Sequence, residues 1–191
     1  MKKVLLLLAN GFEMYEASVF IDVIGWNLAK GDGTTKLATC GMSRQVKSSF
    51  DQCVNVDLTI DEAAVGDYDA LAIPGGFEVY GYYRDAYSDK FLALIQEFHI
   101  MNKIIASVCV GALPVGKSGI LKGKKGTTYG GERQDQLRAF GVEVVDEPIV
   151  VDGSIITSWD PSTAIDVALL VLELLTSPGQ SMRIRTKMGF N

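Results

Sequence analysis

The sequence predicts an α/β fold built on a mostly parallel β-sheet. Short apolar runs alternate with longer amphipathic stretches, which is the pattern of repeated β-α-β units. Several apolar runs also end in glycine turns, as strands do at the carboxyl edge of such a sheet. The 191 residues, 48% of them hydrophobic, are enough for one buried core. We therefore expect a single domain over residues 1–191, with its core at about 3–175 and a C-terminal tail at 176–191.

The order of the elements follows from where each apolar run begins and ends. Buried apolar runs predict strands at 3–9, 35–40, 68–73, 103–108, 125–128, 142–145 and 154–157. Helical periodicity predicts helices at 16–30, 88–101, 110–118 and 162–175. Shorter β signals between residues 44 and 60 indicate a hairpin-like excursion.

The helix ends carry their own signals. Ser88 or Asp89 can cap the second helix, and Asp160 can cap the last one, with Pro161 at its first position. The segment 177–179, Ser-Pro-Gly, is expected to end that last helix. The basic tail that follows is then expected to be a short surface segment.

Charge and hydropathy exclude several classes of protein. The net charge of −5, from 18 Lys+Arg and 23 Asp+Glu, provides no basic face for nucleic acid. The apolar run at 4–9 is far shorter than the roughly 20 residues that span a bilayer. A signal peptide is the competing interpretation of this run, but no small-x-small cleavage site follows it. We expect a cytoplasmic protein that binds neither membrane nor nucleic acid.

The cysteine and histidine content argues against metal sites and disulfides. The three cysteines, Cys40, Cys53 and Cys109, form no C-x-x-C pair, and their number is odd. Structural zinc would need more ligands than these and the single histidine, His99, provide. No metal and no cofactor are expected.

Cys109 carries the strongest chemical signal. It lies in Ser107-Val108-Cys109-Val110-Gly111, between a predicted strand and a predicted helix, which is the arrangement of a nucleophile elbow. Small residues two positions on either side allow strand and helix to approach, and the start of a helix favours the thiolate. The alternative is that Cys109 is a small buried hydrophobic residue, as we expect for Cys40 and Cys53.

Two further groups are expected at the same sheet edge. Gly75 and Gly76 follow the strand at 68–73 and can present N–H donors, which with the Val110 N–H would form an oxyanion hole. Glu16 follows the first strand, together with Glu13, and a carboxyl group beside a thiolate can act as acid or base. Taken alone, the glycines predict only a turn and each glutamate only a solvated residue.

The other side chains give weaker signals. His99 precedes the strand at 103–108, so it is expected at the amino edge of the sheet, roughly 20 Å from Cys109. A Cys–His dyad within the chain is therefore not expected. Tyr129 and Trp159 follow predicted strands and are candidates for pocket walls.

Together these segments resemble the ThiJ/PfpI superfamily, also called the DJ-one family, within the class I glutamine amidotransferase-like fold. The resemblance runs from residue 3 to about 175. Its motifs are Gly11-Phe12-Glu13-Met14-Tyr15-Glu16-Ala17, Asp67-Tyr68-Asp69-Ala70-Leu71-Ala72-Ile73-Pro74-Gly75-Gly76, Ile105-Ala106-Ser107-Val108-Cys109-Val110-Gly111-Ala112, Thr127-Thr128-Tyr129, and Ile156-Thr157-Ser158 with Asp160-Pro161-Ser162-Thr163-Ala164.

The resemblance implies a flavodoxin-like three-layer sandwich, with helices on both faces of the sheet, and a homodimer. It implies that Cys109 is the nucleophile, that Glu16 hydrogen-bonds it and that the backbone of Gly75 and Gly76 faces the sulfur. The chain departs from the family where many members have histidine, at Val110 and Tyr129, and has Phe50 where many have arginine. Histidine-dependent protease chemistry is therefore not expected.

Three functions remain open from the sequence. The first is a cysteine-dependent enzyme, a hydrolase or lyase of the deglycase or glyoxalase kind. It would attack a small electrophile such as an α-oxoaldehyde, a glycation adduct, an amide or a nitrile-like carbon, with Gly75, Gly76, Val110 and Tyr129 around the substrate. The second is a redox-sensing or stress-protective protein whose Cys109 is oxidised reversibly. The third is a non-catalytic binding relative.

Overall fold

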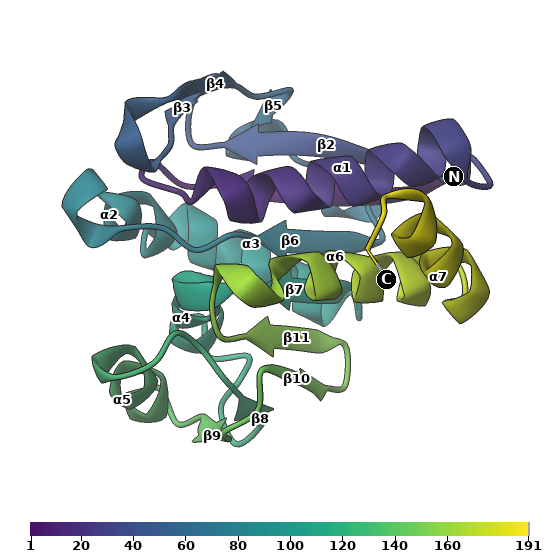
Figure 1. The fold of residues 1–191 in the computed structure, drawn as a ribbon. Helices are drawn as coiled ribbons and strands as arrows, with labels where there is room; N and C mark the ends of the chain where they lie inside the picture. The colour runs from purple at the N-terminus through teal and green to yellow at the C-terminus, as the bar shows by residue number, and fades with distance from the viewer. Residues whose placement is uncertain (191) are drawn as a thin grey trace.

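The computed structural model describes residues 1–190, and a seven-stranded sheet runs through its centre (Figure 1). The strand order is β10-β11-β7-β6-β1-β2-β5. The strands are β1 (Lys2–Leu8), β2 (Thr35–Gly41), β5 (Leu58–Thr59), β6 (Ala70–Ile73), β7 (Ile104–Ser107), β10 (Ile149–Asp152) and β11 (Ile155–Ser158). All neighbouring pairs are parallel except β10 with β11. The predicted α/β class, with its mostly parallel sheet, is confirmed.

Helices cover both faces of this sheet and complete the expected flavodoxin-like sandwich (Figure 1). One layer contains α1 (Met14–Lys30), α6 (Ala164–Leu175) and α7 (Pro178–Lys187), which pack against one another. The other contains α2 (Tyr82–Ala86), α3 (Asp89–Ile100) and α4 (Ala112–Lys117), and α5 (Glu132–Ala139) packs beside α4. Because both faces are covered, the central strand β1 is buried without interruption from Val4 to Leu8.

The predicted excursion between residues 44 and 60 is a hairpin followed by a return to the sheet. β3 (Gln45–Lys47) pairs antiparallel with β4 (Cys53–Asn55), and β5 then adds to the outer edge of β2. At the tip, Phe50 and Asp51 both have a positive φ, at 65° and 68°. The Phe50 ring lies 5.7 Å from the rings of both Phe77 and Tyr80, centroid to centroid.

Some predicted elements are shorter than expected, and others were not predicted. The strands expected at 125–128 and 142–145 are the two-residue strands β8 (Lys125–Gly126) and β9 (Glu143–Val144), which form a separate small sheet. Helices α2 and α5 carry too few apolar residues in a regular period to be predicted, whereas the edge strand β10 is apolar over residues 149–151 but only four residues long. The helix expected at 110–118 begins as a 3-10 turn at 109–111 and continues as α4.

The prediction that the C-terminal tail is only a surface segment is wrong. Ser177 follows α6 and also begins a further helix. Its side chain accepts the Gln180 N–H and so caps α7. In α7, Ile184 is fully buried and the Ser181 hydroxyl donates to the Leu169 carbonyl. A Ser-Pro pair is as suitable for starting a helix as for following one, so the local signal was ambiguous.

This topology brings three connections to one edge of the sheet. The carboxyl ends of the adjacent strands β1, β6 and β7 lead into the loop before α1, the turn at Gly75 and Gly76, and the segment at Cys109. Over residues 1–190, no helix has the length and apolar character needed to cross a membrane.

Candidate active site

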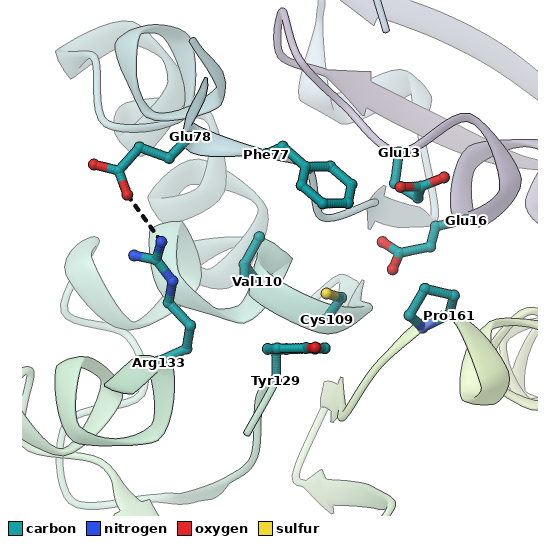
Figure 2. Close-up of a pocket in the computed structure, with 10 residues that line it drawn as sticks. Glu13, Glu16, Phe77, Glu78, Cys109, Val110, Tyr129, Arg133 and Pro161 are labelled. Atoms are coloured by element: carbon teal, nitrogen blue, oxygen red, sulfur yellow. Dashed lines mark hydrogen bonds and ion pairs between the residues drawn. The ribbon is translucent and has the colours of Figure 1, made fainter. Parts of the chain in front are cut away.

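The three connections enclose a cavity of about 360 Å³ at this edge (Figure 2). Its walls combine acidic, aromatic and aliphatic side chains with one thiol and one guanidinium. The lining residues are Glu13, Glu16, Gly76, Phe77, Glu78, Cys109, Val110, Tyr129, Arg133 and Pro161. The predicted residues Glu16, Gly76, Cys109, Val110 and Tyr129 are therefore brought together around one space.

Cys109 occupies a strained backbone position, as a nucleophile elbow requires. Its φ is +56°, a value that costs a non-glycine residue on the order of 1 to 3 kcal/mol. The turn also needs a glycine two residues later, because a Cβ on Gly111 would lie 2.6 Å from the Ile73 carbonyl oxygen. The sharp connection from β7 to α4 thus holds the half-buried thiol at the floor of the cavity (Figure 2).

Glu16 is fully buried and lies beside Cys109 (Figure 2). Its Oε2 accepts the Gly75 N–H at 2.6 Å, whereas its Oε1 has no hydrogen-bond partner within residues 1–190. Gly75 fits between the two side chains: a Cβ there would lie 2.9 Å from the Cys109 Cβ and 3.0 Å from Glu16 Oε2. The glycine turn is therefore what allows the carboxyl group and the thiol to approach.

Burial controls the protonation of Glu16. Loss of solvation raises its pKa to about 8, and this effect outweighs the opposing hydrogen bond from Gly75. The negative charges of Glu13 and Asp160 raise it further. The pKa of Glu13 is itself raised by burial at the cavity wall. A carboxyl group that titrates near neutral pH can both accept and return a proton.

The pKa of Cys109 is raised, which contradicts the expectation that a helix start would lower it. Burial of the thiol is the main cause, the charge of Glu16 adds to it, and the Val110 N–H opposes it. The helical segment here is only a 3-10 turn followed by the six-residue α4, so its dipole does not overcome desolvation. At rest, Cys109 is a thiol, and the adjacent Glu16 can remove its proton once its own carboxyl group is ionised.

The two glycine amides have different surroundings. The Gly75 N–H is taken up by Glu16, so it is not free to donate to a substrate oxygen as the sequence suggested. Gly76 lines the cavity, and its N–H has no acceptor among the described residues. Gly76 and Val110 thus both present backbone amides at the cavity, and the Val110 N–H also faces the Cys109 sulfur.

The remaining candidates lie in different surroundings. Tyr129 lines the cavity and is half exposed, whereas Trp159 does not belong to the lining. Cys40 is buried as predicted, but Cys53 is exposed because it lies on the edge hairpin, so its assignment to the core is wrong.

His99 is in the last turn of α3, which leads into the amino end of β7, away from Cys109. In the described part of the chain, no cluster of His, Cys, Asp and Glu could hold a metal ion.

Sequence reasoning missed four lining residues. Phe77 and Glu78 directly follow the glycine turn, so the rule that placed Gly76 at the carboxyl edge of the sheet could also have placed them there. Pro161 was interpreted only as a helix start. Arg133 belongs to α5, whose sequence Glu-Arg-Gln-Asp-Gln-Leu-Arg-Ala has almost no apolar period to reveal a helix.

Comparisons with known proteins relate the sequence to one protein family. Residues 2–174 match the model of the DJ-1/PfpI family. The chain is 32% identical to a protein of Pyrococcus furiosus named deglycase PfpI, over 83% of this chain and 90% of that protein. It is 31% identical to DJ-1alpha of Drosophila melanogaster, over 91% of this chain and 77% of that protein.

Solved structures show the same fold. The crystal structure of Drosophila melanogaster DJ-1beta superposes with a TM-score of 0.86 at 26% identity, covering 98% of this chain and 97% of that one. The structure of oxidized DJ-1 from Toxoplasma gondii gives a TM-score of 0.82 at 26% identity, covering 98% of both chains. The match over nearly all of its length shows that the chain belongs to the DJ-1/PfpI family.

Proposed function

We propose that this protein is a cysteine-dependent enzyme that acts on small electrophilic carbonyl compounds, such as an α-oxoaldehyde or a glycation adduct. Cys109 is the nucleophile, and Glu16 is the group that takes and returns its proton. The observation that carries this proposal is the fully buried Glu16, with a pKa of about 8, beside the thiol at the floor of an open cavity. A catalytic acid or base works best when its pKa lies near the working pH.

The first step follows from these positions. The Cys109 sulfur attacks the carbonyl carbon, a C–S bond forms, and the π electrons of the C=O bond move to the oxygen. The thiol proton passes to Glu16 in its ionised form, whose Oε1 is buried and without a partner among residues 1–190. Glu16 then returns this proton to the oxygen, which gives a neutral thiohemiacetal. The N–H groups of Gly76 and Val110 can stabilise the oxygen while it is charged.

The names of the relatives support the substrate class. The protein of Pyrococcus furiosus is named a deglycase, and so is a protein of Thermococcus kodakarensis that is 32% identical over 83% of this chain. A deglycase acts on adducts of carbonyl compounds, which contain the kind of carbon that Cys109 would attack. The amide and nitrile-like substrates considered from the sequence have no such support.

The geometry favours an enzyme over a redox sensor. Peroxide oxidises the thiolate, so sensor cysteines have lowered pKa values. Here burial raises the pKa of Cys109, and the adjacent base is suited to removing its proton when a substrate is bound. The step uses only groups of the chain and needs no cofactor. A homodimer and a cytoplasmic location remain parts of this proposal.

Turnover of small α-oxoaldehydes by purified variants tests the proposal. Cys109→Ala is expected to abolish turnover, and Glu16→Gln to lower kcat/KM at least about a hundredfold, the usual contribution of a general base. Cys53→Ala, which removes an exposed thiol outside the cavity, serves as the matched control and should retain full activity. Turnover that survives in Cys109→Ala, or the absence of turnover in the unmodified protein across aldehydes and glycated amines, would contradict the proposal.

A further inference from the structure

The geometry points to a substrate that carries a carboxylate, which Arg133 binds while Cys109 attacks the carbonyl carbon. This inference adds a substrate class to the proposed function and rests on it for the attack step. The binding of the carboxylate by Arg133 can be tested without any turnover.

The cavity has two carboxyl groups at one end and an arginine–glutamate ion pair at the other. Arg133 is the one cationic side chain among the ten that line it. Glu13 and Glu16 lie on the opposite side, with Cys109 between them and the arginine (Figure 2). The surface between is formed largely by Phe77, Val110 and Tyr129 and offers no charge. Because the Glu13 end offers no cation, an anionic group of a substrate finds its partner at the Arg133 end, which fixes the direction in which the substrate enters.

The guanidinium of Arg133 is held in place by three neighbours. It lies over the Tyr83 ring, 5.3 Å from the centroid. Its Nη1 donates to Gln136 at 3.1 Å, and its Nη2 donates to Glu78 at 2.8 Å. A guanidinium has five N–H donors in a planar fork, so these two bonds leave three for a ligand. A group fixed in this way loses little entropy when it binds a carboxylate.

Glu78 is a weak competitor for this arginine. Its side chain is 65% exposed, whereas that of Arg133 is 26% exposed, so the arginine belongs to the wall and the glutamate to the rim. Ion pairs with such an exposed partner contribute only about 0 to 1 kcal/mol. A substrate carboxylate that forms two parallel hydrogen bonds with the guanidinium can replace Glu78 or share the arginine with it.

Matched pairs of thiol reagents measure this preference directly. The reagents are maleimides whose nitrogen carries an acetic, propionic or hexanoic acid chain, each paired with its neutral carboxamide. Mass spectrometry gives the rate constant at Cys109 for each reagent. The acid-to-amide ratio is the rate constant of the acid divided by that of its amide, and it cancels the intrinsic reactivity of the thiol. We expect the ratio at Cys109 to exceed that at exposed Cys53 for at least one chain length, since Cys53 is outside the cavity.

Variants separate Arg133 from general charge effects. Arg133→Gln is expected to lower the ratio at Cys109 about tenfold, the effect of losing a hydrogen bond to a charged group. Glu78→Gln, which removes the competitor, should raise it. Arg138→Gln removes the same charge from an exposed position on the same helix, where the arginine pairs with Asp135, and should leave the ratio unchanged. Arg133→Lys keeps the charge but not the planar fork of donors. Its acid-to-amide ratio should lie between that of Arg133→Gln and that of the unmodified protein.

The outcomes also separate this inference from the proposed function. An acid-to-amide ratio that is the same in Arg133→Gln as in the unmodified protein overturns the inference, even if α-oxoaldehydes are turned over. A ratio that depends on Arg133 in a protein without turnover supports the anion site and contradicts the enzyme. If Cys109 reacts with no maleimide, NMR titration measures the affinity for the anion 2-oxobutanoate and for its neutral amide, 2-oxobutanamide. Equal affinity for both in the unmodified protein then overturns the inference.

Discussion

Raising the pH from 5 to 8 is expected to lower the free energy of unfolding by roughly 3 to 4 kcal/mol through Glu16 alone. The pKa of this carboxyl group is about 8 in the folded protein, against 4.5 for an unperturbed glutamate. Between these values the unfolded chain releases the proton while the folded chain keeps it. The stabilisation is therefore complete below pH 4.5 and is lost as the pH rises through 8.

The difference between the unmodified protein and Glu16→Gln isolates this contribution. Denaturant unfolding of both at a series of pH values cancels the titration of all other groups, so the variant should gain 3 to 4 kcal/mol relative to the unmodified protein between pH 5 and 8. Glu97→Gln, at an exposed position of α3, is the control and should show no such change. A difference that does not vary with pH would show that Glu16 titrates normally.

Gly76→Ala is expected to destabilise the protein by about 3 kcal/mol or more, through overpacking. A Cβ at this position would lie 2.2 Å from the Gly11 carbonyl oxygen and 2.4 Å from a ring carbon of Tyr82. The Gly11 contact is backbone on the loop before α1, and Tyr82 is fully buried, so neither neighbour can move aside cheaply. The turn after β6 and the loop after β1 would be forced apart, and with them the site.

Denaturant unfolding at pH 6 measures this effect. Gly66→Ala is the matched control, because a Cβ at Gly66 meets nothing within 4 Å and its φ is not positive. That variant should be neutral or slightly more stable, since alanine restricts the unfolded chain. Equal stability of the two variants would mean that the close approach of the two loops is not required.

The sequence predicted the part of the site that lies next to strand ends. Cys109 and Gly76 each directly follow an apolar strand, and Glu16 lies in the first turn of the helix that follows β1, so the rule that carboxyl ends meet at one edge was enough to bring them together. The elbow of Cys109 was predictable for the same reason, because its small neighbours lie beside it in the chain. Local patterns determine these features.

The features that were missed depend on contacts between distant segments. Arg133 reaches the cavity from a polar helix that shows no apolar period, and its partners Glu78 and Tyr83 are some fifty residues away in the chain. The rise in the pKa of Cys109 comes from burial, which no local pattern reveals. Likewise, the tail became a helix because Ile184 is buried against the rest of the protein.

The transfer of a proton from Cys109 to Glu16 is the central claim, and the pH dependence of cysteine alkylation tests it most directly. The rate of reaction of Cys109 with iodoacetamide is measured by peptide mass spectrometry from pH 5 to 10 in the unmodified protein and in Glu16→Gln. We predict a rise in the unmodified protein with a midpoint near pH 8, where Glu16 loses its proton, and no rise there in the variant. The same profile in both proteins, or a midpoint below pH 7, would contradict the account.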